Sequence, residues 1–139
     1  MTENNSFYNK EIELTGDPEQ LILDKYTGRP GMFLFYAPWC PHCKNPKITK
    51  LIPILHKQCS KKNIPIHTFN CERPENKDIS VNGYPTLKFF DKNGQLEEAP
   101  NTNPHEIVAR IVQLSDGGDF DETLEALNSE FSDRDKDSE

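Results

Sequence analysis

The chain has 139 residues, a formal net charge of -7, an apolar content of 34% and a mean hydropathy of -0.78. This length suits one domain with a modest core, and the low apolar content predicts that part of the chain adds little to that core. Residues 115–139 carry ten acidic and two basic side chains, a net charge of -8 that leaves +1 for residues 1–114. The acidity therefore belongs to the C-terminal tail.

The ends of the sequence carry no recognisable targeting signal. The N-terminus lacks the basic and apolar regions of a secretory signal, and the final KDSE matches no retention signal. Four cysteines are too few for a secreted disulfide scaffold, and no run is long enough to span a membrane. We therefore expect a cytoplasmic location by default, with neither a membrane nor a nucleic acid as partner. An excess of lysine, 12 against 4 arginines, hints at an AT-rich genome. If the source of the protein were a large DNA virus, the alternative would be a location in the virion.

The first predicted elements are a short strand, a helix and a buried strand. The strand covers residues 11–14. The helix follows Asp17, which has the side chain of an N-cap, with Pro18 at the first helical position and Gln20 to complete a capping box. The continuous apolar run MFLFYA, residues 32–37, is typical of a strand covered on both faces.

Strands and helices alternate in the rest of the domain. The remaining predicted elements are a helix from the cysteines to about Lys62, a strand over 64–69, a short helix over 74–80, a hairpin over 86–98 and a helix over 104–114. Asn93 and Gly94 supply the hairpin turn, and Asn103 caps the last helix. This order predicts an α/β domain over residues 11–114, with a central mixed sheet flanked by helices on both faces. Residues 1–10 are expected to be flexible.

The acidic tail has a helical pattern of apolar residues. Phe120, Leu124, Leu127 and Phe131 recur at helical spacing between acidic residues. For residues 115–139 we favour a partly helical or disordered, solvated extension. The alternative is a segment that docks on a basic or apolar surface.

The sequence APWCPHCK places two cysteines, Cys40 and Cys43, three positions apart at the end of the buried strand. Such a pair could bind a metal, form a structural crosslink or exchange electrons. A closed zinc site needs four ligands, and the other cysteines and histidines form no second pair at suitable spacing. A crosslink over two residues would remove little unfolded-state entropy. Redox exchange is the interpretation that remains.

The position of the pair also suits redox chemistry. Ligand chemistry tends to lie at the carboxyl ends of strands, where a helix begins. There the sulfur of Cys40 would lie near unpaired backbone N–H groups, which stabilise a thiolate, and Cys43 could attack the resulting mixed disulfide. We expect Trp39 to shield one side of the pair and His42 to place a donor near the thiolate.

Two motifs together, FYAPWCPHCK and VNGYPTLKFF, resemble the thioredoxin superfamily, and specifically the catalytic domains of protein disulfide isomerases. The resemblance covers roughly residues 11–114 and implies the thioredoxin fold. It makes Cys40 the attacking thiol and Cys43 the buried resolving thiol. It also implies that Pro85 is a cis-proline facing the dithiol. We expect Cys40 and Cys43 to be catalytic, His42 and Pro41 to tune the thiolate, and Trp39, Tyr84 and Pro85 to position the substrate.

The sequence departs from the family pattern at two places in the core. Related domains carry a buried acid where this chain has Leu34, and the lysine that often accompanies the acid appears here as Thr68. Losing both keeps the core neutral. We therefore expect Cys43 to deprotonate less readily and the mixed disulfide to be released slowly.

A third departure concerns the helix after the cysteines. The family commonly has a proline at the position of Ile48, whereas this chain has Pro46 and Pro53. An internal proline costs about 3 kcal/mol unless the helix bends. The helix is therefore predicted to be broken or displaced.

The dipeptide between the cysteines bears on redox direction. Pro41-His42 is found in strongly oxidising DsbA-type proteins, whereas isomerases carry Gly-His and thioredoxins carry Gly-Pro. Potentials across these classes span about 150 mV, or roughly 7 kcal/mol for two electrons. We predict a potential nearer the isomerase and DsbA end.

The other cysteines are expected to be buried or idle. Cys71 follows the strand over residues 64–69 and could emerge beside the dithiol, whereas Cys59 should lie far from it. The sequence DGGD at residues 116–119 is similar to a glutathione-binding stretch, but it lies beyond an extra helix. A helix end and linker explain it better.

These observations lead to two functional hypotheses. The first is a thiol-disulfide oxidoreductase that acts on protein thiols and disulfides as a monomer, needs no added cofactor, and has a separate redox recycling partner. Its direction would be isomerase-like or oxidising. The second is a redox-linked binding module with weak turnover, which captures client proteins.

Overall fold

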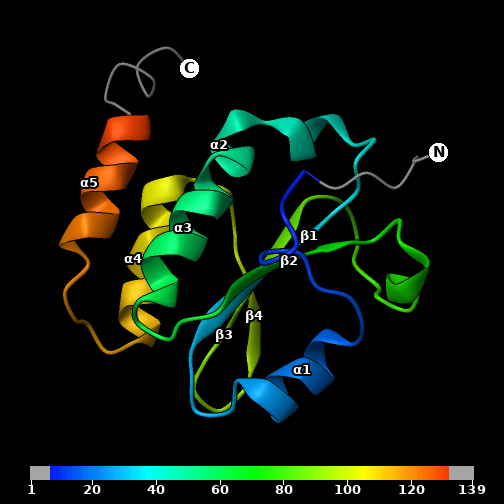
Figure 1. Cartoon of the computed structure of the whole chain (residues 1–139), viewed down its shortest axis with the longest axis horizontal. Helices are drawn as coiled ribbons and strands as arrows, with labels where there is room; N and C mark the ends of the chain where they lie inside the picture. Colours follow the sequence, from blue (N-terminus) through cyan, green and yellow to red (C-terminus); the bar gives the residue numbers. More distant parts are fainter. Residues whose placement is uncertain (1–6, 132–139) are drawn as a thin grey trace.

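The computed structural model describes residues 7–131 and shows a four-stranded mixed sheet with helices on both faces (Figure 1). The strands are β1 (Gly31–Tyr36), β2 (Ile66–Asn70), β3 (Thr86–Phe90) and β4 (Leu96–Glu98), in the order β2-β1-β3-β4. Strand β1 is parallel to β2 and antiparallel to β3, and β3 and β4 form the predicted hairpin. The predicted α/β class is therefore confirmed.

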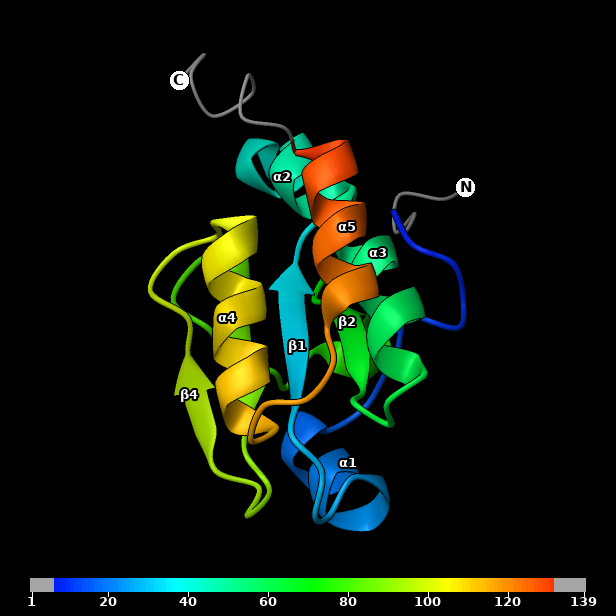
Figure 2. The same cartoon turned by 90° about the vertical axis from the view of Figure 1, so that its left-hand side faces the viewer.

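The helices divide between the two faces of this sheet. They are α1 (Pro18–Lys25), α2 (Pro46–Thr49), α3 (Leu51–Ser60), α4 (Pro104–Leu114) and α5 (Asp121–Glu130), with 3-10 turns η1 (Pro41–Lys44) and η2 (Pro74–Asn76). Figure 2 shows α3, α4 and α5 together over one face, whereas α1 lies at the lower end of the sheet. Phe33 and Phe35 of β1 pack in the α1 cluster, and Leu34 and Tyr36 pack in the cluster with α3, α4 and α5.

The predicted strand over residues 11–14 is reduced to one parallel bridge between Glu13 and Thr68. The reason is a turn before it, in which the amides of Ile12 and Glu13 donate to the carbonyl of Asn9 at 3.1 and 3.0 Å. Only the end of the segment is extended enough to pair with β2. The amide of Leu14 donates to the carbonyl of Thr68 at 2.8 Å.

The helix after the cysteines is broken, as predicted. Asn45 is extended, with φ -61° and ψ 129°, because a residue before proline is disfavoured in the helical region. Its side chain then caps α2 by accepting the amide hydrogen of Lys47 at 2.8 Å. The chain therefore forms η1, α2 and α3 in succession. The predicted helix over residues 74–80 is likewise shorter than expected, with only η2 helical.

The packed domain extends beyond residues 11–114 at both ends. Tyr8 is buried, and Phe120, Leu127 and Phe131 join the core through α5, which packs on α3. The favoured picture of a solvated extension is therefore wrong for α5, because its apolar residues cover α3. The surface on which it docks belongs to this chain and is basic as well as apolar. Predictions for residues 1–6 and 132–139 lie outside the described part.

Candidate dithiol active site

The two predicted catalytic cysteines lie just past the carboxyl end of β1. The amide of Cys40 donates to the carbonyl of Ala37, and the amide of Cys43 donates to the carbonyl of Cys40, both at 3.1 Å. The pair is carried by the four-residue turn η1, which ends at the break before α2. The cysteines, which were expected where a helix begins, therefore lie at a short 3-10 turn.

Cys43 is the buried member of the pair. The residue exposes 1% of its surface, and burial raises the pKa of its thiol from 9.0 to about 12. A hydrogen bond with Cys40 raises the pKa further, while a bond involving the backbone of Ala37 opposes the shift. At neutral pH this thiol is therefore protonated, and it needs a proton acceptor before it can attack a disulfide.

Cys40 faces the loop that precedes β3. Its thiol donates to the carbonyl oxygen of Tyr84, with Sγ and O 3.4 Å apart. The peptide bond between Tyr84 and Pro85 is cis, as predicted. Cys40 exposes 6% of its surface, so only a small part of this residue is accessible.

Trp39 and Tyr84 form an aromatic pair next to the dithiol. Their ring centroids are 5.9 Å apart and their planes nearly perpendicular, and Trp39 exposes 61% of its surface. The indole Nε1–H donates to the carboxylate of Glu72 at 2.9 Å. Glu72 was not among the site residues predicted from the sequence. The only signal for it was its position next to Cys71, just after β2.

Cys71 lies at the same edge of the sheet as the dithiol, as predicted for a residue after a parallel strand. Its amide donates to the carbonyl of Tyr36 at 2.8 Å. Burial raises the pKa of the Cys71 thiol, and a hydrogen bond with the Tyr84 hydroxyl opposes that shift. The thiol is thereby linked to the loop that faces Cys40.

Pro41 and His42, predicted to tune the thiolate, are both exposed. His42 lines a cavity of about 380 Å³ together with Asn45, Tyr84 and Pro85. The histidine therefore shares a cavity with the loop whose carbonyl accepts the hydrogen bond of the Cys40 thiol. The structure brings Trp39, Tyr84, Pro85 and the two cysteines together near the carboxyl end of β1. His42 lies next to this group, in the lining of the cavity.

The match to known proteins covers most of this domain. The family model named Thioredoxin matches residues 19–113. The chain belongs to the thioredoxin family. Protein disulfide-isomerase erp38 of Neurospora crassa is 42% identical over 67 residues, which are 47% of this chain and 18% of that protein. Protein disulfide isomerase-like 2-2 of Oryza sativa is 41% identical over 86 residues, covering 58% and 21%.

Structural similarity agrees with this assignment. The first thioredoxin domain of mouse protein disulfide-isomerase A4 aligns with a TM-score of 0.53 and 28% identity, covering 74% of each chain. The chain thus contains a thioredoxin domain that is similar to domains of protein disulfide isomerases. It spans about a fifth of the length of the two curated relatives.

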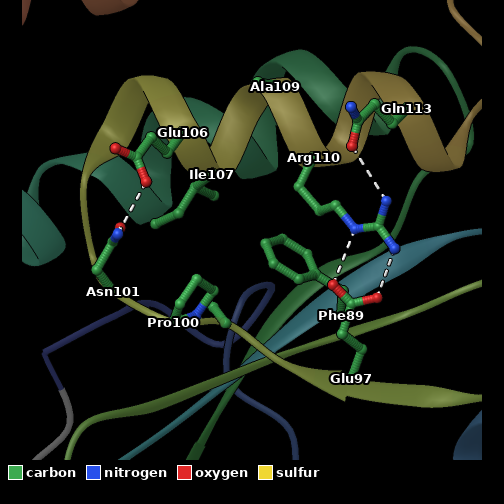
Figure 3. Close-up of a pocket in the computed structure, with 10 residues that line it drawn as sticks. Phe89, Glu97, Pro100, Asn101, Glu106, Ile107, Ala109, Arg110 and Gln113 are labelled. Atoms are coloured by element: carbon green, nitrogen blue, oxygen red, sulfur yellow. Dashed lines mark hydrogen bonds and ion pairs between the residues drawn. The ribbon is translucent and has the colours of Figure 1, made fainter.

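A second cavity of the thioredoxin domain, about 290 Å³, lies between β4 and α4 (Figure 3). Phe89, Pro100 and Ile107 line it between two polar ends. At one end Arg110 forms an ion pair with Glu97, with its Nε 2.8 Å from Oε2. The two cavities share three lining residues, numbers 99–101, so both adjoin the loop before α4.

The remaining predicted features lie away from the dithiol. Cys59 is buried near the far end of α3, and burial raises the pKa of its thiol to about 12. Residues 116–119 link α4 to α5, with positive φ at Asp116, Gly117 and Gly118. The amide of Gly117 donates to the carbonyl of Val112 at 2.8 Å, so this stretch ends a helix, as predicted.

Residues 7–131 hold neither a candidate metal site nor a helix that could span a membrane. Those residues contain no group of three or more His, Cys, Asp or Glu side chains placed to hold a metal ion. Within the same range, every helix is too short or too polar to cross a membrane.

Proposed function

We propose that this thioredoxin domain is a thiol-disulfide oxidoreductase that exchanges electrons between the Cys40–Cys43 pair and protein substrates. The observation that carries the proposal is the asymmetry of the pair. The Cys40 thiol contacts the Tyr84–Pro85 loop, which lines a cavity, and Cys40 exposes 6% of its surface, whereas Cys43 exposes 1%. One thiol can therefore meet a substrate while the other can meet only its neighbour.

The reaction proceeds by two displacements when the dithiol is reduced. The Cys40 thiolate attacks a substrate disulfide, forms a mixed disulfide and releases one substrate thiolate. Cys43 then loses its proton and attacks the Sγ of Cys40. The Cys40–Cys43 disulfide forms, the mixed disulfide breaks, and the second substrate sulfur leaves as a thiolate that takes up a proton. The reverse sequence oxidises a substrate dithiol, and a redox partner returns the pair to its starting state.

The cavity beside Pro85 supports a protein rather than a small-molecule substrate. It is open, and its lining combines the exposed turn at His42 and Asn45 with the start of β3 and the loop before α4. An extended segment around a substrate cysteine would fit along such a surface. We propose an isomerase-like or oxidising direction, because Pro41 and His42 separate the cysteines.

Trapping tests this proposal directly. A Cys43→Ser variant should accumulate mixed disulfides with protein substrates, because the second displacement is removed. The doubly substituted Cys40→Ser, Cys43→Ser variant is the matched control and should trap none. The wild-type protein should also reduce insulin and oxidise a dithiol peptide well above the uncatalysed rate. If neither trapping nor turnover exceeds the control, the proposal fails.

A second candidate function is a redox-linked binding module with weak turnover. The raised pKa of Cys43 favours it, because a protonated resolving thiol releases a mixed disulfide slowly. Such a module would capture substrates in the trapping experiment but would barely accelerate insulin reduction or peptide oxidation. The ratio of capture to turnover therefore separates the two functions.

A further inference from the structure

We propose that this protein has a second site, separate from the dithiol, which binds a small organic molecule that carries a doubly charged phosphate group. The site is a cavity of about 470 Å³ at the amino end of β1, whereas the cysteines lie past the carboxyl end of the same strand. This volume is within the range of small-molecule pockets in proteins. The walls that the described residues form include none of the residues proposed for the thiol chemistry.

Four segments that are far apart in the sequence form these walls. They are residues 28–30 before β1, residues 62–64 between α3 and β2, Lys92 in the hairpin turn, and parts of residues 115–120 between α4 and α5. Figure 2 shows the α4–α5 linker and the start of β1 at the same lower end of the molecule. The amide of Gly28 donates to the carbonyl of Lys92 at 3.2 Å, which ties two of the segments together. The cavity is therefore a product of the fold rather than of a single loop.

Three cationic side chains, those of Arg29, Lys62 and Lys92, line the cavity from three of these segments. Lys92 forms an ion pair with Asp116, with Nζ 2.5 Å from Oδ2, and the Nζ of Lys62 lies 4.9 Å from the centre of the Phe120 ring. Within residues 7–131 the guanidinium of Arg29 has neither an ion pair nor a hydrogen bond. A guanidinium without a partner can bind two oxygens of one phosphate.

The backbone of the α4–α5 linker adds hydrogen-bond donors to the lining. Asp116, Gly117 and Gly118 have successive positive φ values of 64°, 87° and 117°. The amides of Gly118 and Asp119, which both line the cavity, find no acceptor in the part of the chain that the structure describes. Successive N–H groups in a turn of this kind can bind an anion. The linker thus supplies neutral donors beside the three cations.

The balance of charge favours a small anion over an acidic macromolecule. Asp119 is the one acidic residue among the described lining residues, and its Oδ1 accepts the amide hydrogen of Asp121 at 3.0 Å. With Asp116, the lining and its border carry three positive and two negative charges, although the whole chain has a net charge of -7. A long polyanion would be repelled by the rest of the surface, whereas a small anion meets only the local excess of positive charge.

An apolar wall favours an organic phosphate over the inorganic ion. Pro30 is buried, and Ile64 and Phe120 expose 4% and 5% of their surfaces. A monoester can place its phosphate among the cations and its ring or alkyl group against these side chains. It also keeps close to two negative charges at neutral pH, because its second pKa is about 6.

Titration of the full chain with phenyl phosphate tests the site. Phenyl phosphate should bind saturably with a Kd of about 0.1–1 mM at low salt. In ¹H–¹⁵N spectra the amide signals of Gly28, Gly118 and Asp119 should shift, while the indole signal of Trp39 should not. Inorganic phosphate should bind at least about threefold more weakly, because it has no apolar part. Phenyl sulfate, with one charge, should bind at least about tenfold more weakly.

Substitutions in the lining should change this affinity in opposite directions. Arg29→Gln and Lys62→Gln should each raise the Kd for phenyl phosphate at least about fivefold, because each removes a charge-assisted hydrogen bond. Both side chains are exposed, so the fold should be kept. Asp119→Asn should lower the Kd about twofold by removing a repulsion. Lys57→Gln, an exposed lysine of α3 outside the lining, is the matched control and should leave the Kd within about twofold.

Two further readouts separate this site from the dithiol and from weak general attraction. The Cys43→Ser variant should bind phenyl phosphate as the wild type does, so failure of the proposed function would leave this result unchanged. Added salt should weaken binding in the wild type more than in the Arg29→Gln, Lys62→Gln double variant. Equal affinity for phenyl phosphate and phenyl sulfate, an unchanged Kd in both single variants, or no binding of phenyl phosphate would overturn the inference.

Discussion

Two buried cysteines in this domain show how little burial alone says about function. Cys43 and Cys59 each expose 1% of their surface, and burial raises the pKa of each thiol to about 12. Their surroundings differ. Cys43 adjoins a second thiol at the carboxyl end of β1, whereas Cys59 lies near the end of α3 with Lys62 as its charged neighbour. We therefore expect reactivity to depend on the partner thiol rather than on burial.

The same substitution at the two sites is the most severe test of this comparison. Cys43→Ser should lower multiple-turnover insulin reduction at least about a hundredfold, because an intramolecular displacement has a large effective concentration. Cys59→Ser should leave the rate per folded molecule within about twofold. Insulin turbidity, with circular dichroism as the folding control, measures both. Equal losses at the two sites would contradict the comparison.

The surroundings of Cys43 were predictable only in part. Cys40, Trp39 and Pro85 lie in the two short motifs that resemble the thioredoxin superfamily. That resemblance implied their juxtaposition, and the antiparallel pairing of β1 with β3 brings the two motifs together. Tyr8 and Glu13 could not be found in this way. Glu13 pairs with β2 through one bridge to Thr68, and a pairing so short leaves no periodic pattern in the sequence, while Tyr8 belongs to no helix or strand.

The packing of α5 on α3, the helix that carries Cys59, was not predicted for a different reason. The apolar spacing of Phe120, Leu127 and Phe131 was visible, but the acidic composition favoured a solvated extension. Composition could not show that Lys50 and Lys61, which flank α3, form ion pairs with Glu130 and Glu122 of α5. The acidic residues of α5 match a basic rim, and its apolar residues complete the core.

A large-to-small substitution in the core between α5 and α3 should destabilise the fold without changing thiol-disulfide exchange at Cys40 and Cys43. Leu127 is fully buried in α5, so Leu127→Ala should lower the free energy of unfolding by about 2–5 kcal/mol. Leu124→Ala on the same helix, where 40% of the side chain is exposed, should cost less than about 0.5 kcal/mol. Urea unfolding measures both. If the two variants lose the same stability, α5 is not packed as described.

Alkaline pH should weaken the fold through the buried thiols. The thiol of Cys59 has a pKa of about 12 when folded and an ordinary value of 9.0, so between these values the unfolded chain binds fewer protons. Stability must therefore fall as pH rises above about 9.

Cys59→Ala isolates this contribution. The variant should be less stable than the wild type at pH 7, because it leaves a cavity, and the difference should shrink as pH rises above 9. Urea unfolding under reducing conditions at several pH values checks this. A difference that stays constant with pH would show that this thiol is not protected as the structure indicates.

The smallest expected effect concerns the ion pairs that join α3 to α5. Lys61 and Glu122 are 3.3 Å apart, but their side chains expose 52% and 73% of their surfaces, so water and salt screen the pair. Lys61→Met should therefore change the free energy of unfolding by less than about 1 kcal/mol, and less still at high salt. A larger loss would mean that charge, rather than the apolar contacts of Leu127 and Phe120, holds α5 over Cys59. In that case the packing around Cys59 would depend on ionic strength, while the surroundings of Cys43 would not.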